Sequence, residues 1–293
     1  MPATADSNWH IAVIGGSGLA AGLALDGAQT IEVASPFGPP SAAVTTGTMA
    51  GVRFTFLPRH GEGHVIPPGN INYRANIDVL KRCGVTDLIA LSAIGSLSSV
   101  MAPGSFVAVD QFIDRTSGRE GSFFGSGLVA HVSLADPVCP RLRAGLVAAA
   151  QAEEAWVHDG GCYVAIDGPQ FSTRAESRLY QSWGGDVIGM TGMPKARLAR
   201  EAELPYAMLG MVTDYDSWRA DDAGVEAGNV VEVMHRNVAL ARRVIERLAS
   251  SLPGTRSPSP IDGALDNAVM TEPAARDPVL VAKLQAVAGR VLR

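Results

Sequence analysis

Two carboxylates stand two residues apart in the segment Thr213-Asp214-Tyr215-Asp216, directly after the apolar run of residues 206–212. Side chains alternate along an extended chain, so both carboxylates would point into one pocket. Burial and a neighbouring like charge each raise the pKa of a carboxyl group, which lets such a pair keep a proton for general acid chemistry. Metal binding is the alternative use of paired carboxylates, but this segment lacks the His or Cys ligands that would support it.

An Arg-His pair, Arg59-His60, follows a predicted strand that ends at Leu57. The planar guanidinium of arginine matches phosphate oxygens in a bidentate way, and a histidine can donate one more hydrogen bond. The glycine-rich turn at residues 15–18 offers backbone amides and the Ser17 hydroxyl to the same kind of anion. This turn lacks the lysine of a P-loop, so it predicts a phosphate site only together with the Arg-His pair.

Further hydroxyls and one aromatic ring stand where ligands bind in α/β proteins. Ser92 and Thr191 each end an apolar segment that predicts a buried strand, and ligands lie at the carboxyl ends of such strands. Phe171, with Ser172 beside it, precedes a predicted helix and offers a face on which a purine can stack. Capping of the next helix is the alternative role of each hydroxyl.

These residues need a framework of alternating strands and helices to bring them together. Apolar runs of strand length predict strands at residues 10–14, 30–34, 42–48, 52–57, 87–92, 105–113, 162–166, 186–190 and 206–213. Helical spacing predicts helices at residues 72–83, 140–154, 173–183, 194–203 and 225–250. The alternation predicts a single α/β domain with a mixed central β-sheet flanked by helices.

The last part of the chain differs from the rest. Three prolines between Pro253 and Pro260 exclude a regular element there, so this stretch predicts a linker. Apolar residues then line one face of a helix predicted at 277–292, which is too short to be stable alone. We expect a catalytic domain over residues 10–250 and, in 251–293, a linker and a C-terminal helical tail that docks on the core or on a neighbouring subunit.

Composition excludes several classes of protein. The 293 residues are 47% hydrophobic and 18% charged, which is typical of a globular chain that leans toward oligomer formation. A formal net charge of −5, without any Lys/Arg cluster, argues against nucleic-acid binding. The three cysteines have neither disulfide-framework nor zinc-site spacing, and no signal-peptide layout or membrane-length apolar run is present. We expect a cytoplasmic protein without nucleic-acid or membrane partners.

The chain resembles the methylthioadenosine phosphorylases, a trimeric type of purine nucleoside phosphorylase, from about residue 10 to residue 250. Seven short blocks of sequence carry the resemblance. Any one of them could occur by chance, but their shared order and spacing are highly specific. The blocks that carry the resemblance are Ile14 to Leu19, Arg59-His60-Gly61, Asn72 to Asn76, Asp110 to Asp114, Gly168 to Ser172, Gly189-Met190-Thr191 and Thr213 to Asp216.

The resemblance implies a homotrimer with an active site near each subunit interface. Phosphate is implied to contact Ser17, Arg59, His60, Ser92, Ala93 and Thr191. The implied partners of purine and ribose are Phe171, Ser172, Met190 and the catalytic pair, Asp214 and Asp216. The 5' substituent is expected against Val225, Ala227, Val230 and Val231, with His131 arriving from the adjacent subunit.

The implied reaction is phosphorolysis of the N-glycosidic bond of a 5'-modified adenosine, which gives adenine and a 5-substituted ribose 1-phosphate. Bond cleavage leaves positive charge at C1' and negative charge on the purine, so catalysis needs an anion beside C1' and a proton at N7. Bound phosphate, a co-substrate, supplies the anion. Asp214, with its pKa raised by burial and by the neighbouring Asp216, is expected to hold the proton, while the other carboxylate accepts from the exocyclic amine. No metal or organic cofactor is required.

Other functions remain open on the sequence. Gly189 and Gly192-Met193-Pro194 resemble a branch that cleaves 6-oxopurine nucleosides such as methylthioinosine, whereas paired carboxylates favour the donor amine of adenine. A nucleoside hydrolase would need no phosphate clamp, and a non-catalytic nucleoside-binding protein would not need Arg59 and the aspartates together. The sequence also leaves the 5' substituent open, because an apolar pocket discriminates by only about 1–3 kcal/mol per methylene.

Overall fold

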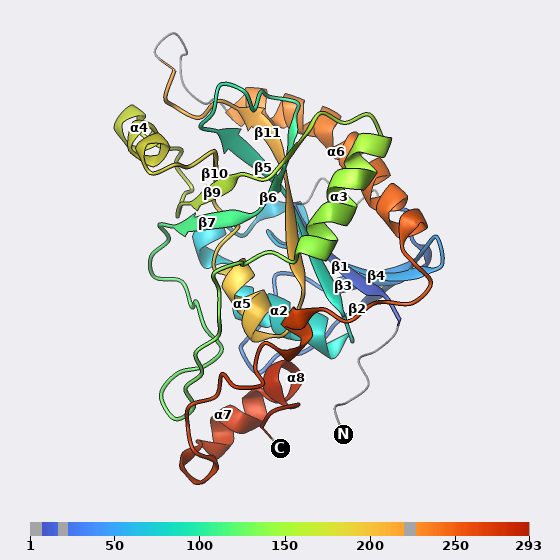
Figure 1. The fold of residues 1–293 in the computed structure, drawn as a ribbon, viewed down its shortest axis with the longest axis vertical. Coiled ribbons are helices and arrows are strands. Elements are labelled where there is room, and N and C mark those ends of the chain that lie inside the picture. Colours follow the sequence, from blue (N-terminus) through green and yellow to red (C-terminus); the bar gives the residue numbers. More distant parts are fainter. Residues whose placement is uncertain (1–7, 17–22, 220–226, 293) are drawn as a thin grey trace.

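The computed structural model describes residues 8–16, 23–219 and 227–292, which form an α/β fold around one mixed sheet (Figure 1). In this part of the chain the sheet has eleven strands, with a main path β2-β3-β4-β1-β5-β10-β9-β7 and with β11, β6 and β8 attached through β5. Both parallel and antiparallel pairs occur, so the predicted mixed sheet is confirmed. The strands are β1 His10–Gly15, β2 Asp26–Ile31, β3 Val44–Met49, β4 Val52–Pro58, β5 Asp87–Ser96, β6 Phe106–Val109, β7 Gln111–Asp114, β8 Val157–Asp159, β9 Cys162–Ala165, β10 Val187–Gly189 and β11 Tyr206–Asp214.

Helices cover both sides of the central strands. The longest helix, α6, packs against α3 and β11, while α2 packs against α5 on the other side of the sheet (Figure 1). The α-helices are α2 Tyr73–Arg82, α3 Pro140–Ala152, α4 Arg174–Ser182, α5 Lys195–Glu201, α6 Ala227–Ser251, α7 Pro278–Lys283 and α8 Gln285–Ala288. Short 3₁₀ turns lie at Glu62–His64, Pro68–Asn70, Pro260–Gly263 and Pro273–Ala275.

The central strand, β5, has two edges that are used differently. On one edge β11 pairs with it in parallel along residues 88–95. On the other edge β1 pairs with residues 87–90 and β10 with residues 95–96. Residues 91–94 therefore keep one edge free of strand pairing, and the sheet opens there. The predicted end of this strand at Ser92 is wrong, because β5 continues to Ser96 and places Ser92 at the opening.

Burial explains why the central strands were readable as apolar runs. All residues of β1 are buried, and all but one of β5, because a strand covered by helices on both faces has no polar side. The outer strand β2 is exposed along its whole length. Such an edge strand carries little hydrophobic signal, and the structure accordingly places it at Asp26–Ile31 instead of the predicted 30–34.

The strand predicted at 105–113 is wrong as a single element. The chain changes partners at Asp110: β6 pairs with β11 and β8, whereas β7 pairs with β9. The Asp110 carboxylate accepts a hydrogen bond from the Gly161 amide at 3.0 Å, which stabilises the change of direction. Residue hydropathy does not reveal this break, because the residues on both sides of it are strand formers.

The predicted tail helix at 277–292 is also wrong as one element, because it consists of α7 and α8. The chain tightens at Leu284, whose carbonyl accepts bonds from both the third and the fourth residue after it. This side chain is fully buried, and with Val287 and Ala288 it belongs to the main hydrophobic core. The tail was expected to dock on the core or on a neighbouring subunit. In this structure of one chain, it packs on the core of the same chain.

The segment predicted as a linker has no helix or strand between residues 252 and 259, as expected, but it is anchored. Arg256 is buried there and pairs with Asp87 at the start of β5 and with Asp262. Asp87 is fully buried and also pairs with Arg141 at the start of α3. A buried carboxylate needs such partners because desolvation is costly. The tail thereby becomes part of the fold.

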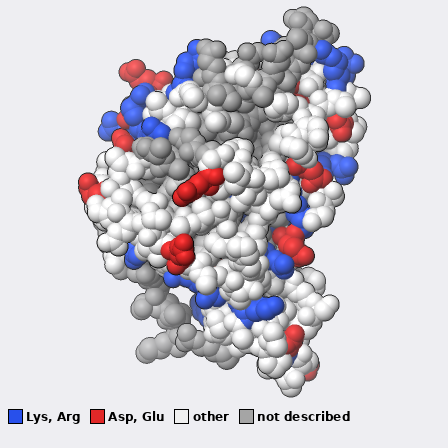
Figure 2. Space-filling view, turned by 180° about the vertical axis from the view of Figure 1, so that it is seen from behind, with Lys and Arg blue, Asp and Glu red and all other residues white. Residues whose placement is uncertain are grey.

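The surface carries no dominant charge on the side shown in Figure 2. Acidic and basic side chains lie interspersed there on a largely uncharged surface, in line with the 18% of charged residues in the sequence. None of the helices in the described residues combines the length and the apolarity that a membrane crossing needs.

Replacing Arg256 by Met should destabilise the protein by about 3 kcal/mol, because removal of one partner from a buried ion pair leaves an undercompensated charge at Asp87. Urea unfolding followed by circular dichroism measures the free energy of unfolding. The matched control is Arg143→Met, which removes the partner of the exposed Asp159 and should change stability by about 0–1 kcal/mol. Equal effects of the two substitutions would contradict the anchoring role of Arg256.

Candidate active site

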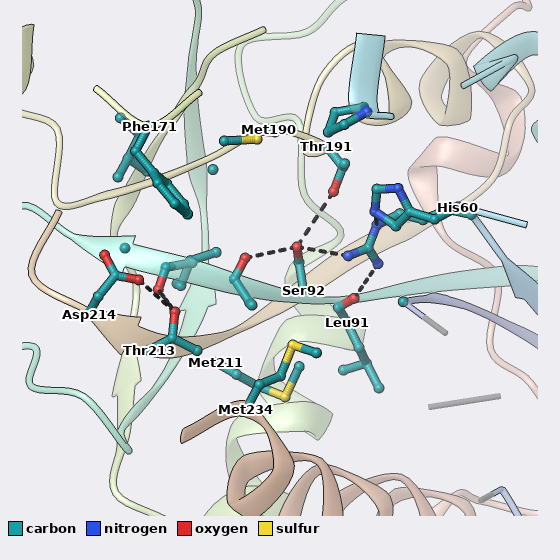
Figure 3. Close-up of a pocket in the computed structure, with 18 of the residues that line it drawn as sticks. His60, Leu91, Ser92, Phe171, Met190, Thr191, Met211, Thr213, Asp214 and Met234 are labelled. Atoms are coloured by element: carbon teal, nitrogen blue, oxygen red, sulfur yellow. Dashed lines mark hydrogen bonds between the residues drawn. The ribbon is translucent and has the colours of Figure 1, made fainter. Parts of the chain in front are cut away.

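A cavity of about 290 Å³ lies at the opening of the sheet beside β5 (Figure 3). Its walls come from β5 itself, from the ends of β10 and β11, from the loop after β4 and from α6. The carboxyl ends of β4 and β11, which run in the same direction as β5, reach this opening from one side. The end of β10, which is antiparallel to β5, reaches it from the other side. Most of the predicted site residues line it together: Arg59, His60, Ser92, Ala93, Phe171, Met190, Thr191, Asp214 and Asp216.

The remaining predicted residues have other positions. Ser172 is buried beside Asp216 but does not line the cavity. His131 is exposed, and its backbone amide donates to the Ala268 carbonyl at 2.8 Å. Ser17 and Val225 lie outside the described residues, and so do the side chains of three residues in the first turns of α6, namely Ala227, Val230 and Val231.

Arg59 brings a buried positive charge to one end of the cavity. Its guanidinium donates to the Leu91 carbonyl at 2.8 Å, to the Ser92 hydroxyl at 3.3 Å and to a ring nitrogen of His60 at 3.0 Å. All three partners are neutral, and among the described residues no Asp or Glu forms an ion pair with it. The Ser92 hydroxyl also lies 3.5 Å from that of Thr191. A buried cation without a counter-charge, with hydroxyls next to it, is a site for an anion.

His60 supports Arg59 and has no proton to offer to an anion in this arrangement. The arginine always donates, so His60 Nε2 must accept, and Nδ1 then carries the proton that is donated to the Ile66 carbonyl at 2.8 Å. Burial, followed by the charge of Arg59, lowers the pKa of His60 to about 3, so the ring is neutral. The expectation that His60 donates to phosphate is therefore wrong for this geometry. His64 stacks on it, with 4.1 Å between ring centroids, and also lines the cavity.

Tyr163 holds the segment that carries Met190 and Thr191. Its hydroxyl accepts hydrogen bonds from the amides of Thr191 and Gly192, each at 3.3 Å. A Cβ atom at Gly189 would lie 2.3 Å from the Tyr163 hydroxyl, and one at Gly192 would lie 2.7 Å from its ring. Both glycines are thus explained by close packing on Tyr163. This packing accounts for the two glycines without reference to the base.

The two aspartates meet the cavity in an unexpected conformation. Asp214 ends β11, but Asp216 has a φ of 51°, so the segment is not extended as predicted. The Asp216 amide donates to one oxygen of Asp214 at 2.8 Å, and the Thr213 hydroxyl donates to the other at 2.7 Å. Burial raises the pKa of Asp216, although a hydrogen bond from Ser177 opposes the shift. The pair therefore joins an anchored carboxylate to one that burial makes easier to protonate.

Apolar side chains, with Phe171 at the rim, complete the cavity. Phe171 is 42% exposed and lies at the same end of the cavity as Asp214 (Figure 3). His60 lies at the other end, and Ser92 and Thr191 lie between them (Figure 3). Several further lining residues are apolar and were not predicted from the sequence, namely Ile94, Ile188, Met211, Met234 and Val238. Met234 and Val238 stand four residues apart on α6, so helical spacing was the available signal.

Lys195 was also missed, and it lies under the anion site. Its side chain is buried between α5 and α2, and among the described residues its amine has no hydrogen-bond partner. Burial, together with the charge of Arg59, lowers the pKa of Lys195 well below its usual value. The amine is therefore neutral more readily than a surface lysine, and Arg59 carries the charge of the site. No group of three or more potential metal ligands occurs among the described side chains.

Comparison with known proteins places this geometry in a family. The profile of the Phosphorylase superfamily matches residues 10–250. The S-methyl-5'-thioadenosine phosphorylase of Bradyrhizobium diazoefficiens is 55% identical over 285 residues, which cover 97% of this chain and 98% of the relative. That of Cereibacter sphaeroides is 54% identical with the same coverage.

Solved structures agree with the sequence relatives. A methylthioadenosine phosphorylase from an antarctic soil metagenomic library superposes with a TM-score of 0.87 at 40% identity, covering 96% of this chain and 99% of the other. Methylthioadenosine phosphorylase from Schistosoma mansoni, in complex with adenine, has a TM-score of 0.77 at 36% identity and covers 83% of this chain and 91% of its own.

Replacing Lys195 by Met should stabilise the protein by about 1–3 kcal/mol at pH 7, because it removes a buried polar group that has no hydrogen-bond partner in the part of the chain that the structure describes. The pKa of Lys195 is lowered in the folded state. Between this lowered pKa and the unfolded-state pKa of about 10.4, the unfolded chain binds more protons than the folded one, so the wild type loses stability as the pH falls. The advantage of the variant should thus shrink as pH rises. Urea unfolding at pH 7 and pH 9 measures the difference in the free energy of unfolding between the variant and the wild type.

The exposed Lys283 provides the control for this prediction. Lys283→Met should change stability by less than about 0.5 kcal/mol, and equally at both pH values. A destabilised Lys195→Met variant, or a gain in stability that is the same at both pH values, would show that the buried amine is charged and compensated.

Proposed function

The chain belongs to the phosphorylase superfamily, and on that premise we propose that it cleaves 5'-methylthioadenosine, or a close 5'-deoxyadenosine analogue, with inorganic phosphate. The products are adenine and a 5-substituted ribose 1-phosphate, so the enzyme is a pentosyltransferase. One observation carries the proposal: a buried arginine, which pairs with no Asp or Glu of the described residues, lies at one end of a cavity, and a carboxylate pair lies at the other. Residues 10–250 form the catalytic domain, and residues 251–293 form the tail.

Phosphate is proposed to bind at the Arg59 end of the cavity. There Arg59 supplies charge, Ser92 and Thr191 supply hydroxyls, and Ala93 lies on the unpaired edge of β5. Ser17 is assigned to the same anion on the resemblance. His60 contributes by holding the guanidinium through its ring nitrogen. Fixed donors in a site shielded from water stabilise an anion more strongly than water-exposed donors do.

The purine is proposed to lie between Phe171 and the aspartate pair. A phosphate oxygen forms a bond to C1' as the bond from C1' to N9 breaks, and the bonding electrons move to the purine. A proton carried by the pair of Asp214 and Asp216 goes to N7, while the other carboxylate accepts from the exocyclic amine of adenine. Burial raises the pKa of Asp216, which supports a shared proton. Ser172 lies beside this pair.

The ribose and its 5' substituent are proposed to occupy the middle of the cavity. Met190 lies against the ribose, and the 5' group is assigned on the resemblance to Val225, Ala227, Val230 and Val231. His131 is proposed to complete the site of the adjacent subunit in a homotrimer, and its exposure in one chain supports this arrangement. Nucleoside and phosphate are then the small-molecule partners. The proposed enzyme is cytoplasmic and needs no metal or organic cofactor.

Replacing Arg59 by Ala should raise the KM for phosphate on the order of 10- to 100-fold, because each lost hydrogen bond to a charged group costs about 1.5–3 kcal/mol. Initial rates of adenine release at varied phosphate concentration measure this. The control is Arg115→Ala, whose guanidinium lies over Trp183 and outside the cavity. Normal phosphate kinetics in the Arg59 variant would refute the assignment of the anion site.

Replacing Asp214 by Asn should abolish most turnover of methylthioadenosine and raise the relative activity on methylthioinosine, because the amide offers a donor to O6 and no acidic proton. An acceptor oxygen that faces a carboxylate leaves both unpaired, at about 1–3 kcal/mol each. Release of free base from both nucleosides measures the ratio of the two activities. The control is Asp159→Asn, which changes an exposed carboxylate that pairs with Arg143. A wild-type protein that prefers methylthioinosine would overturn the assignment of the base.

A further inference from the structure

We infer that Arg119 is a positioning residue of the proposed reaction, which holds the phosphate-side and purine-side loops of the cavity in a fixed relation. Arg119 does not line the cavity and touches neither substrate site. Its action would pass through two loop segments, residues 166–171 and 190–193, which carry the predicted purine and phosphate contacts. The inference rests on the proposed function for the identity of the two substrates, but not for the contacts that support it.

The contacts of Arg119 connect these two segments directly. Its side chain is only 3% exposed. One terminal nitrogen, Nη1, donates to the carbonyls of Met190 at 2.7 Å and Met193 at 2.8 Å. The other, Nη2, donates to the carbonyls of Ile166 at 3.2 Å and Asp167 at 2.9 Å. A single guanidinium therefore bridges the backbone of the two segments, which follow the paired strands β9 and β10.

A third loop joins through Tyr73. Arg119 donates to the Tyr73 hydroxyl at 3.2 Å, and this hydroxyl donates to the Pro68 carbonyl at 3.0 Å. Pro68 belongs to the loop that follows Arg59, and it lines the cavity, as do Ile166 and Met190. Three lining residues that are distant in sequence thus share one buried network.

The chemistry of the contacts calls for an arginine. Five N–H groups in a rigid planar fork can meet several carbonyls at once, whereas a lysine ammonium is a compact group with three donors and cannot span both segments. The loop that carries Arg119 is itself held, because the Ser117 hydroxyl donates to the Asp167 carboxylate at 2.8 Å. The same carboxylate lies 3.5 Å from Arg119 Nε. Arg119 therefore holds the two segments and is itself held in place through Asp167.

Positioning matters because phosphate must meet C1' in line while the purine is held. Thr191 follows Met190, and Phe171 follows the segment at 166–167, so a relative shift of the two segments would separate the two substrates. A misplacement of about 1 Å can cost on the order of 100-fold in rate. A defect at Arg119 should therefore change the constants for both substrates, although it contacts neither.

Arg119→Lys in the full-length protein tests this inference. We expect kcat/KM for methylthioadenosine to fall on the order of 100-fold, with the KM values for phosphate and nucleoside rising together. The matched control is Arg256→Lys, because Arg256 also has a side chain only 3% exposed within a multi-bonded network, but it anchors the tail. That control should lower the unfolding temperature and leave kcat and both KM values of the folded enzyme unchanged.

A milder variant, Tyr73→Phe, removes only the hydroxyl that links Arg119 to Pro68. It should change both KM values in the same direction, by about tenfold or less. If Arg119→Lys and Tyr73→Phe lower only the unfolding temperature, as the control does, Arg119 is structural and the inference is overturned. A wild-type protein without phosphate-dependent turnover would overturn the proposed function instead. Calorimetric affinities for phosphate and adenine would then decide on Arg119, because both should weaken together in its variant.

Discussion

The buried guanidinium of Arg59 is the feature around which the site is organised. A charge removed from water is costly unless it is compensated, and here its hydrogen-bond partners are a carbonyl, a hydroxyl and a neutral imidazole. The fold accepts this arrangement because the same groups that hold the cation also surround a space for an anion. In the proposed function, phosphate supplies the missing charge and, beside C1', becomes the nucleophile. The stability of the site and its chemistry therefore depend on the same charge.

The opening in the sheet makes this arrangement possible. If β1 and β10 met along the edge of β5, the Leu91 carbonyl would be used by the sheet and could not hold Arg59. The separation of these two strands frees residues 91–94 and brings Ser92 to the cavity. The remaining walls come from the ends of β10 and β11, from α6 and from loops. Arg119 holds carbonyls of the segments that follow β9 and β10, so buried polar contacts add to the pairing of these two strands.

The identity of the site could be predicted to a large extent from the sequence, for a physical reason. Arg59 and Asp214 each stand at or just after the end of a predicted strand, and the carboxyl ends of parallel strands meet at one edge of an α/β sheet. Thr191 also follows a predicted strand, but that strand, β10, is antiparallel to β5, so only the structure shows that Thr191 reaches the same place. Residue type then limits the chemistry, since a guanidinium binds anions and paired carboxylates hold protons. The mixed sheet and the docking of the tail follow from hydropathy, which reports burial directly.

Other features were decided only by the tertiary structure. The left-handed backbone at Asp216, the use of both ring nitrogens of His60, and the Lys195 amine beneath Arg59 depend on neighbours that are distant along the chain. The role of Arg119 left no trace in residue type, because its partners are mostly main-chain carbonyls, which every residue carries. The sequence by itself therefore determined which groups can do chemistry and the burial pattern that assembles them. Their hydrogen-bond partners and protonation states were decided only when the chain folded, because both are properties of the surroundings.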